Sequence, residues 1–483
     1  MDGFWQEAEG MKFYEKNPAY FSRLMLADDR GRRVTYQDFW DFYETTEMLS
    51  GGTFCFLFCE NTIGAVFFYL ACLNRRVVPL LLDKNMDNAL RDNLIRTYEP
   101  QYLIFPDDMA QKCQDADSEV LTAWDYHVLK RENIPPAALN EELALLLTTS
   151  GSTGSPKLVR QSWKNISSNA AAIADYLKLT STERPITTLP MNYTYGLSII
   201  NSHLQAGAAI LLTTCTMFEQ KFWDFFKEAG ATSFGGVPYT YTILRRLSFF
   251  NMELPSLRTM TQAGGKLPEG LHRQFAEYAR RTGRQFFVMY GQTEATARMG
   301  YLPPEKSLEK CGSMGIAIPG GRFHLMDDAH QEIETVDTVG ELVYEGPNVT
   351  LGYAVCREDL GKDDENKGIL FTGDMASRDL DGYYYIKGRK KRFLKIYGKR
   401  VNMDEIEQMI RTEYEDVEAA CIGEDDQMRI YLAGKPQAFC ETAANWLSVK
   451  TGIHPRNLQV RTIDAIPKNA AGKTQYGELE TNK

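Results

Sequence analysis

The sequence predicts an α/β protein with more than one domain, and three observations support this. Apolar segments of strand length alternate with segments of helical length, most clearly at 53–58, 61–74 and 77–82, which is the pattern of a parallel βαβ unit. From residue 320 the chain changes to short β-type segments. Finally, 483 residues exceed what one hydrophobic core usually holds.

The remaining elements follow from the same patterns. In the first part of the chain, strands are expected at 33–36, 102–105, 143–147, 185–189, 208–213, 233–237 and 286–289, with helical segments between the later ones. In the β-rich part, strands are expected at 322–326, 340–344 and 383–386. After the basic residues 389–392, a small α+β part is expected, with a helix near 403–413 and strands near 419–422 and 428–432.

Composition excludes several classes of function. The net charge of −10, from 54 basic and 64 acidic residues, disfavours binding to nucleic acid or to an anionic membrane. The longest apolar run, 65–73, is too short to span a membrane, and residues 1–7 lack a signal-peptide pattern. Nine scattered cysteines and six histidines show no zinc-site spacing. Because the cysteines are odd in number and many lie in apolar runs, we expect reduced thiols and a cytoplasmic protein.

Residues 148–157 form a loop rich in hydroxyl groups and glycine, Thr-Thr-Ser-Gly-Ser-Thr-Gly-Ser-Pro-Lys. The buried strand at 143–147 precedes it and a helical segment at 162–176 follows it, so the predicted order is strand, loop, helix. Glycines let backbone N–H groups turn inward, hydroxyls add donors, and Lys157 adds positive charge, which suits a polyphosphate. The spacing is not that of a P-loop, and a polar surface loop is the alternative.

Four further motifs are candidates for a functional site. Tyr-Gly-Gln-Thr-Glu at 290–294 follows a predicted strand, where ligands of open α/β sheets gather, and its hydroxyl and carboxylate suit a phosphate and a magnesium ion. Phe-Thr-Gly-Asp at 371–374 can present a carboxylate to ribose hydroxyls. The basic segment 388–400 and the segment 467–474 complete the set. Taken singly, the first two motifs also fit surface turns. The basic segment also fits a solvated charged face, and the segment 467–474 fits a frayed C-terminal loop.

Taken together and in this order, the five motifs resemble those of the acyl-adenylate-forming superfamily, which includes acyl-CoA synthetases, peptide-synthetase adenylation domains and beetle luciferase. The resemblance covers essentially the whole chain. It implies a large N-terminal domain, residues 1–389, of parallel-type sheets flanked by helices plus a small β-barrel-like part. It also implies a small mobile α+β C-terminal domain, residues 390–483.

The resemblance implies two half-reactions. A carboxylate attacks the α-phosphate of ATP to give acyl-AMP and pyrophosphate, and a thiol then attacks the acyl-AMP. Because negative charge gathers at the phosphorus, this chemistry needs placed positive groups more than acids or bases. ATP, Mg²⁺ and coenzyme A are therefore the expected cofactor and co-substrates.

The resemblance also assigns roles to residues that match the family's motifs. The catalytic residues are Lys473, Thr293, Glu294 and Lys395, with Glu294 as the magnesium ligand. ATP binding falls to Thr149, Ser150, Gly151, Ser152, Thr153, Gly154, Lys157, Tyr290, Gly291, Asp374 and Arg389. The acid is bound by Tyr193, Tyr195, Gly236, Gly264 and Gly265, with pocket walls at 235–239, 263–265 and 296–299. Lys391 is the hinge, and Gly398 lies beside the tunnel for the thiol.

Three positions depart from the family's pattern. Leu158 stands where glycine is usual, Trp163 where histidine is often found, and Tyr193 where acyl-CoA synthetases usually have histidine. Tyr193 borders the carboxylate site, so the departure leaves the acyl specificity open. The segment near Tyr193 offers no aspartate to pair with an α-amine, which disfavours an amino acid substrate. Small residues at 263–265 fit a long or flat acyl group, or tight strand packing.

The leading hypothesis is a ligase that converts a fatty or aryl carboxylic acid into an acyl-CoA through acyl-AMP. The alternative is transfer of the acyl group to the phosphopantetheine thiol of a separate carrier protein. A nucleotide-binding sensor without chemistry is a third interpretation, against which the Gly-Lys context of Lys473 speaks. No nucleic acid partner and no transmembrane segment are expected.

Overall fold

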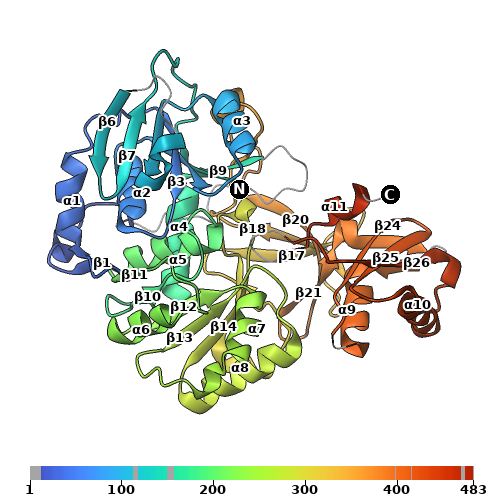
Figure 1. The fold of residues 1–483 in the computed structure, drawn as a ribbon. Coiled ribbons are helices and arrows are strands. Elements are labelled where there is room, and N and C mark those ends of the chain that lie inside the picture. Colours follow the sequence, from blue (N-terminus) through green and yellow to red (C-terminus); the bar gives the residue numbers. More distant parts are fainter. Residues whose placement is uncertain are drawn as a thin grey trace. The chain divides into compact units, whose positions relative to one another are not determined.

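The computed structural model describes residues 12–112, 118–148, 157–396, 399–414, 416–468 and 474–481. They fold into two compact units (Figure 1). The large unit holds the described residues up to 323 together with 344–370, and the small unit holds 324–343 and the residues from 371 onward. The α/β fold class is confirmed, whereas the domain boundary between 389 and 390 stays a prediction.

The first sheet of the large unit has nine strands in the order β16-β15-β14-β13-β12-β10-β11-β1-β2. The six strands from β14 to β1 are parallel to one another, and the edge strands β2, β15 and β16 are antiparallel to their neighbours. The strands are β1 Leu24–Asp28, β2 Arg33–Thr35, β10 Pro185–Ile186, β11 Ile210–Leu212, β12 Ser233–Gly236, β13 Thr259–Gln262, β14 Gln285–Tyr290, β15 Gly300–Leu302 and β16 Ile316–Ala317.

The second sheet has eight strands in the order β19-β9-β8-β4-β3-β5-β7-β6. Its centre, β8-β4-β3-β5, is parallel, and β3 and β4 pair along their whole length with α2 as the crossover, as the apolar pattern predicts. The strands are β3 Phe54–Cys59, β4 Val78–Asp83, β5 Tyr102–Pro106, β6 Ser118–Ala123, β7 Tyr126–Lys130, β8 Leu143–Thr148, β9 Leu158–Ser162 and β19 Gly352–Ala354.

Helices α2, α4 and α5 lie between these two sheets, and one core joins them (Figure 1). That core combines Leu57 and Leu147 of the eight-stranded sheet with Leu26 and Ile210 of the nine-stranded sheet. Helix α2 is buried on nearly all sides, which explains its continuous apolar sequence. The helices of the large unit are α1 Tyr36–Glu44, α2 Ile63–Asn74, α3 Asn88–Tyr98, α4 Trp163–Tyr176, α5 Thr194–Gln205, α6 Gln220–Glu228, α7 Pro238–Arg246 and α8 Glu269–Thr282.

The segment around the hydroxyl-rich loop differs from the predicted order of strand, loop and helix. A second strand, β9, precedes α4 and pairs with β8 in antiparallel fashion, with Thr148 opposite Leu158. The loop residues between them therefore connect two paired strands. Helix α4 then begins as predicted, and Ser162 and Asn165 close a capping box at its start.

The small unit is built from short sheets and three helices. A four-stranded sheet, β17-β18-β20-β21, draws most of its residues from this unit, and a hairpin, β22-β23, and a three-stranded sheet, β24-β25-β26, follow. Apolar side chains of α9, α10 and the three-stranded sheet form its main core. The elements are β17 Arg322–Met326, β18 Gly340–Glu345, β20 Ile369–Arg378, β21 Tyr384–Arg389, β22 Phe393–Ile396, β23 Lys399–Asn402, α9 Met403–Glu413, β24 Ala419–Glu424, β25 Gln427–Ala433, α10 Gln437–Thr451, β26 Leu458–Ile463 and α11 Tyr476–Thr481.

In the part of the chain that the structure describes, no helix is both long enough and apolar enough to cross a membrane.

Candidate active site

The carboxyl edge of the nine-stranded sheet brings several predicted site residues together. Strands β12, β13 and β14 are parallel and in register, with Gly236 opposite Gln262 and Gln262 opposite Val288. Gly264 follows β13 by two residues, and Tyr290 ends β14. The predicted acid-binding glycines and the 290–294 motif therefore share the edge at which open α/β sheets bind ligands.

Tyr193 joins this edge from the start of α5, where it is the N-cap residue. A Cβ atom built on Gly264 would lie 2.7 Å from the Tyr193 hydroxyl oxygen, and Gly264 has a φ of +83°, so a side chain there would be both strained and obstructed. Burial raises the pKa of the Tyr193 hydroxyl. Tyr193 and Gly264 are thus neighbours, as their shared assignment to the acid site requires.

Tyr195 lies one step deeper than Tyr193, and it is buried. The two ring centres are 6.4 Å apart, and the Tyr195 hydroxyl lies 2.8 Å from the Thr261 hydroxyl of β13. Burial raises the pKa of the Tyr195 hydroxyl, so it stays protonated. Tyr195 therefore forms the inner wall behind Tyr193.

A tight turn after β14 fixes the 290–294 motif. Thr296 has φ of 67° and ψ of −56°, and the Ala297 N–H donates to the Ala295 carbonyl oxygen at 2.7 Å, which together make a γ-turn of the rare, strained kind. The turn directs the Ala297 carbonyl against Gly291, where a Cβ atom would lie only 1.8 Å from that oxygen. Gly291 must therefore be glycine for this turn to form.

Asn348 anchors the same turn. Its side-chain amide donates to the Ala295 carbonyl oxygen at 2.8 Å, and its own carbonyl oxygen accepts from the Thr296 hydroxyl at 2.7 Å. These hydrogen bonds hold Thr293 and Glu294 in a short 3₁₀ turn at the edge of the sheet. The strain at Thr296 is thus offset by contacts from a distant segment.

Tyr353 connects two of the sequence motifs. Its hydroxyl donates to Glu294 Oε1 at 2.7 Å, and the Lys157 ammonium lies 5.3 Å from the centre of its ring. Strand β19 places it there, because Tyr353 pairs with Val159 just after the hydroxyl-rich loop. The structure therefore brings Lys157 and Glu294 into contact with one tyrosine, the first with its ring and the second with its hydroxyl. Sequence reasoning missed Tyr353, which carries no motif of its own.

The oxygen ligands at this position suit magnesium. Glu294 is half-buried and stands next to the Thr293 hydroxyl, and both are the hard oxygen donors that Mg²⁺ prefers. Among the described residues, no group of three or more His, Cys, Asp or Glu side chains could hold a metal ion. Such a sparse donor set fits an ion that arrives with substrate phosphates and water and takes only one or two ligands from the protein.

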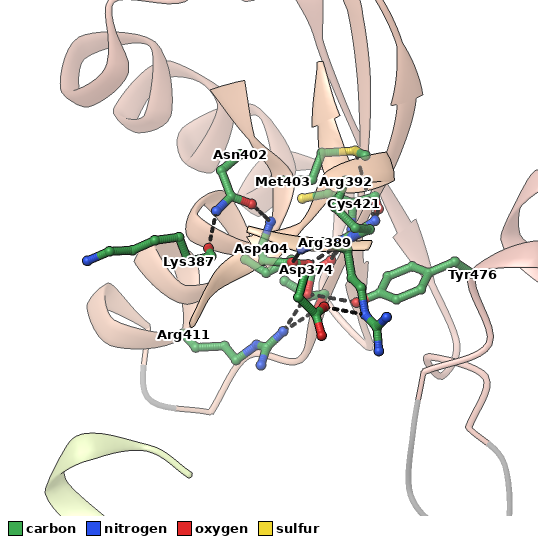
Figure 2. A network of polar contacts seen from close by, with 12 residues as sticks. Asp374, Lys387, Arg389, Arg392, Asn402, Met403, Asp404, Arg411, Cys421 and Tyr476 are labelled. Atoms are coloured by element: carbon green, nitrogen blue, oxygen red, sulfur yellow. Dashed lines mark hydrogen bonds and ion pairs between the residues drawn. The ribbon is translucent and has the colours of Figure 1, made fainter. Parts of the chain in front are cut away.

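In the small unit, Asp374 and Arg389 form an ion pair (Figure 2). They face each other across strands β20 and β21, and Arg389 Nε lies 2.8 Å from Asp374 Oδ1. Asp374 is buried and Arg389 is exposed by about half. The two residues assigned to the ribose hydroxyls are thus adjacent, with a carboxylate and a guanidinium side by side.

Arg392, the residue after the predicted hinge Lys391, is the centre of a buried polar network (Figure 2). Its guanidinium donates to Asp404 Oδ1 at 2.8 Å, to Glu407 Oε1 and to the Cys421 carbonyl oxygen, and it lies 3.9 Å from the centre of the Tyr476 ring. Lys391, immediately before it, is exposed. The basic segment 388–400 is therefore not simply a solvated surface, because Arg392 within it is buried and hydrogen-bonded to other parts of the small unit.

Several predicted residues lie outside the described residues, so their positions stay predictions. These are Thr149, Ser150, Gly151, Ser152, Thr153, Gly154, Gly398, Lys473 and the side chain of Lys395, whose backbone belongs to β22. Lys157, Tyr290 and Glu294 belong to the large unit, whereas Asp374 and Arg389 belong to the small one. The convergence of all five motifs on one ATP also stays a prediction.

Two of the departures from the family's pattern have packing roles. Leu158 is fully buried in β9. Trp163 packs edge-on against Tyr14, with ring centres 5.6 Å apart, and the Arg76 guanidinium lies 4.1 Å from the centre of its ring. The two residues belong to the two hydrophobic cores on which the ends of β9 pack.

Comparison with known proteins shows which sequences and structures this chain resembles. The family model described as AMP-binding enzyme matches residues 12–354. Oxalate–CoA ligase of Arabidopsis thaliana is 30% identical over 387 residues, which cover 76% of this chain and 71% of that protein. 2-Succinylbenzoate–CoA ligase of Geobacillus sp. is 27% identical over 78% of this chain and 77% of that protein.

The fold is shared with a solved enzyme. O-succinylbenzoate coenzyme A synthetase from Bacillus subtilis, in complex with AMP, superposes with a TM-score of 0.78 at 22% identity, covering 95% of this chain and 96% of the other. The same enzyme in complex with ATP and magnesium ion gives a TM-score of 0.75. With a family model matching most of its length and a relative at 30% identity, this chain belongs to the AMP-binding enzyme family.

Proposed function

We propose that this protein is an acid–thiol ligase that activates a carboxylic acid with ATP, releases pyrophosphate, and transfers the acyl group from acyl-AMP to coenzyme A. The contact of Lys157 and Glu294 with Tyr353 carries the proposal, because it places a cation and a magnesium-type ligand at one point beside the acid-binding edge. The relatives are CoA ligases for oxalate and 2-succinylbenzoate, which supports an acid substrate and coenzyme A as acceptor.

In the first half-reaction, an oxygen of the acid forms a bond to the α-phosphorus as the bond to pyrophosphate breaks. Lys157 stabilises the charge on the departing pyrophosphate, together with the hydroxyl-rich loop. Glu294, with Thr293 beside it, would hold Mg²⁺, which supplies positive charge to the phosphate oxygens. Tyr290 stacks on the adenine, and Asp374 and Arg389 hold the ribose hydroxyls.

In the second half-reaction, the thiol of coenzyme A attacks the acyl carbon and AMP leaves. The roles here are proposals from the resemblance: Lys391 acts as the hinge, Lys395 approaches the acyl phosphate, and Gly398 leaves room for the pantetheine arm. Lys473 serves the first step by bridging the carboxylate and the α-phosphate. The described cysteines are all free thiols, which fits a reducing compartment such as the cytoplasm.

The test is pyrophosphate–ATP exchange with a panel of fatty, aryl and dicarboxylic acids, followed by thioester formation with coenzyme A or with a phosphopantetheinylated carrier protein. We expect acid-dependent exchange and a thioester only with coenzyme A. Lys473→Ala should abolish exchange while ATP still binds, whereas Lys468→Ala, whose ammonium pairs with Glu418 at 2.6 Å on the surface, should keep it. ATP binding without exchange for any acid would instead support a nucleotide sensor.

A further inference from the structure

Arg298 is a buried arginine without a carboxylate partner. It is 2% exposed, and its guanidinium contacts only neutral groups among the described residues: the Ser198 hydroxyl at 3.2 Å, the Tyr176 hydroxyl at 3.0 Å and the Met289 sulfur at 3.2 Å. The face of the Tyr195 ring lies 5.0 Å away. A buried charge is costly unless an opposite charge compensates it, so this site lacks its anion.

The other buried arginines of the described residues show what compensation looks like in this fold. Arg160 lies 2.9 Å from Glu365, Arg91 lies 2.8 Å from Asp92, and Arg392 contacts Glu407. Each of these three cations has a carboxylate from the protein itself. Arg298 is the exception, and it is also the one beside the predicted acid site.

Arg298 lines a cavity of about 110 Å³ between α5 and the face of β12 and β13, which extends from the amino ends of these strands to Thr261 and Arg298. Three other charged residues line the cavity: Lys178, Glu183 and Arg258, of which Glu183 and Arg258 are paired with each other at 3.2 Å. Gly235, Thr261 and Ile199 line it as well. This volume exceeds that of a single water several-fold, so the cavity can take several non-hydrogen atoms. A Cβ atom on Gly235 would lie 2.7 Å from the Ile199 side chain, so the glycine keeps the cavity open at this level.

His203 adds a second unpartnered polar group to the same cavity. Its side chain is buried, and Nδ1–H donates to the Ile199 carbonyl oxygen at 2.8 Å, which leaves a lone pair on Nε2. No hydrogen-bond partner for Nε2 exists among the described residues. Apart from the Arg258–Glu183 ion pair, the cavity therefore offers a guanidinium that contacts no carboxylate of the described residues and an imidazole nitrogen that can accept a hydrogen bond.

Tyr195 links this cavity to the predicted acid site. The centre of its ring lies 5.0 Å from the Arg298 guanidinium and 6.4 Å from the centre of the Tyr193 ring. Tyr193 in turn touches Gly264 at the carboxyl edge of the sheet. A substrate whose reacting carboxylate lies at that edge would point its far end towards Tyr195 and Arg298.

We propose that Arg298 and the cavity behind Tyr195 form a specificity subsite for a second anionic group at the far end of the acid, so that the preferred substrates are dicarboxylic acids. The guanidinium would bind the distal carboxylate in the two-pronged manner typical of arginine, and His203 Nε2 would accept a hydrogen bond from a substrate hydroxyl or from a water carried with it. This inference rests on the proposed function and names its substrate class.

The first measurement compares acids on the unaltered enzyme. Pyrophosphate–ATP exchange is measured with the diacids malonate through suberate and isophthalate, each against its monoacid from propionate through octanoate and benzoate. We expect kcat/KM for the best diacid to exceed that of its matched monoacid by roughly 100-fold or more, because a site built for a charged group rejects analogues that lack it. A preference for monoacids throughout would overturn the proposal.

The second measurement changes the protein. Arg298→Met should lower kcat/KM for the diacid by ~100-fold and leave or raise that for the monoacid, and Arg298→Lys should retain part of the diacid preference. Arg91→Met, which removes a different buried arginine, should leave the ratio unchanged. If diacid and monoacid lose activity equally in Arg298→Met while its thermal unfolding matches that of the unaltered enzyme, the subsite is refuted.

Calorimetric titration of the best diacid into the unaltered enzyme and into Arg298→Lys provides a readout without turnover. We expect weaker binding in the variant and competition between the diacid and its matched monoacid, since both occupy one pocket. Simultaneous binding of the two acids would place the cavity outside the acid site and overturn the proposal. Exchange with monoacids but without any diacid preference refutes this inference alone, whereas absence of exchange with every acid refutes the proposed function as well.

Discussion

Position 291 must be glycine because the Ala297 carbonyl oxygen approaches its backbone too closely for any side chain. Gly291→Ala would place a methyl carbon within 1.8 Å of that oxygen, so the γ-turn at Thr296 must open. We expect a loss of roughly 3 kcal/mol in stability and a large loss of adenylation, as for other strained backbone sites. Urea unfolding and pyrophosphate exchange measure the two effects.

Gly270→Ala is the matched control for that substitution. Gly270 lies in the first turn of α8, and a Cβ atom there would meet nothing within 4 Å. Alanine favours a helix over glycine by up to about 1 kcal/mol, so this variant should be as stable as the unaltered protein or slightly more so. Equal behaviour of the two alanine variants would contradict the role given to the γ-turn.

Tyr353→Phe tests the contact between two motifs. The substitution keeps the ring beside Lys157 and removes the hydrogen bond to Glu294. Hydrogen bonds to charged groups contribute about 1.5–3 kcal/mol when buried, and Tyr353 is 38% exposed, so we expect the lower end: a rise of roughly ten-fold in KM for MgATP with little change in unfolding temperature. Unchanged steady-state kinetics with MgATP would show that the contact does not serve the nucleotide site.

At the level of residues, sequence reasoning can name the members of a local motif, but it misses residues whose partners come from far along the chain. The adjacency of Tyr193 and Gly264 agrees with their shared assignment. Tyr353 and Arg298 were missed as individual residues because their importance depends on contacts from other segments. A buried arginine cannot be told from an exposed one until its surroundings are known.

Among the elements, the strands of the parallel sheets are the best predicted. The continuous apolar sequences of β3, α2 and β4 reflect burial on nearly all sides, and such runs can be recognised from the sequence alone. Strand β9 escaped prediction because its sequence contains Arg160 and Gln161, both fully buried. Arg160 is tolerated there only because Glu365 and three carbonyl oxygens receive its donors.

Arg392, just after β21, is hydrogen-bonded to Glu407 of α9 and to the Cys421 carbonyl oxygen of β24. Arg392→Met would leave Glu407 buried without its main cation, and loss of one partner of a buried pair costs about 3–5 kcal/mol. We expect faster hydrogen exchange in peptides from α9 and the three-stranded sheet, measured by mass spectrometry. Lys391→Met changes the neighbouring exposed residue and should leave exchange as it is. Equal protection in both variants would mean that the network does not stabilise the unit.

At the scale of the whole molecule, two buried histidines link stability to pH. Burial lowers the pKa of His203 to about 4 and that of His272 to about 4, whereas both titrate near 6.5 when unfolded. Between these values the unfolded chain binds more protons than the folded one, so stability is complete above pH 6.5 and falls as the pH drops towards 4. Each histidine then contributes a loss of at most about 3 kcal/mol.

The measurement is urea unfolding of the large unit at a series of pH values between 7.5 and 4.5. The slope of unfolding free energy against pH should be smaller for His272→Gln than for the unaltered protein, whatever the variant's absolute stability. His272 is suitable because its ring nitrogens already contact Ser307 and the Gly312 N–H, so glutamine can keep one of these hydrogen bonds. Identical slopes would show that His272 titrates alike in both states.

The family was predictable from the sequence because five motifs occur in a fixed order over the whole chain, and the family comparison confirms it. The substrate class was not predictable, because the five motifs describe the chemistry of ATP and the residues assigned to the acid lie outside them. More than one domain was expected from the length of the chain, whereas the predicted boundary between residues 389 and 390 stays a prediction. The exact boundary depends on packing that no local pattern encodes.

The single layer of helices shared by the two large sheets limits how this protein can evolve. Recombination that exchanged one sheet with a relative would leave α2, α4 and α5 facing a foreign surface, and Phe67, Leu147 and Ile200 would lose their complementary neighbours. We therefore expect crossovers to be tolerated near residue 370, where the chain leaves the large unit, and to be harmful between α2 and α5. New acid specificities are then expected to arise by point substitutions around the pocket.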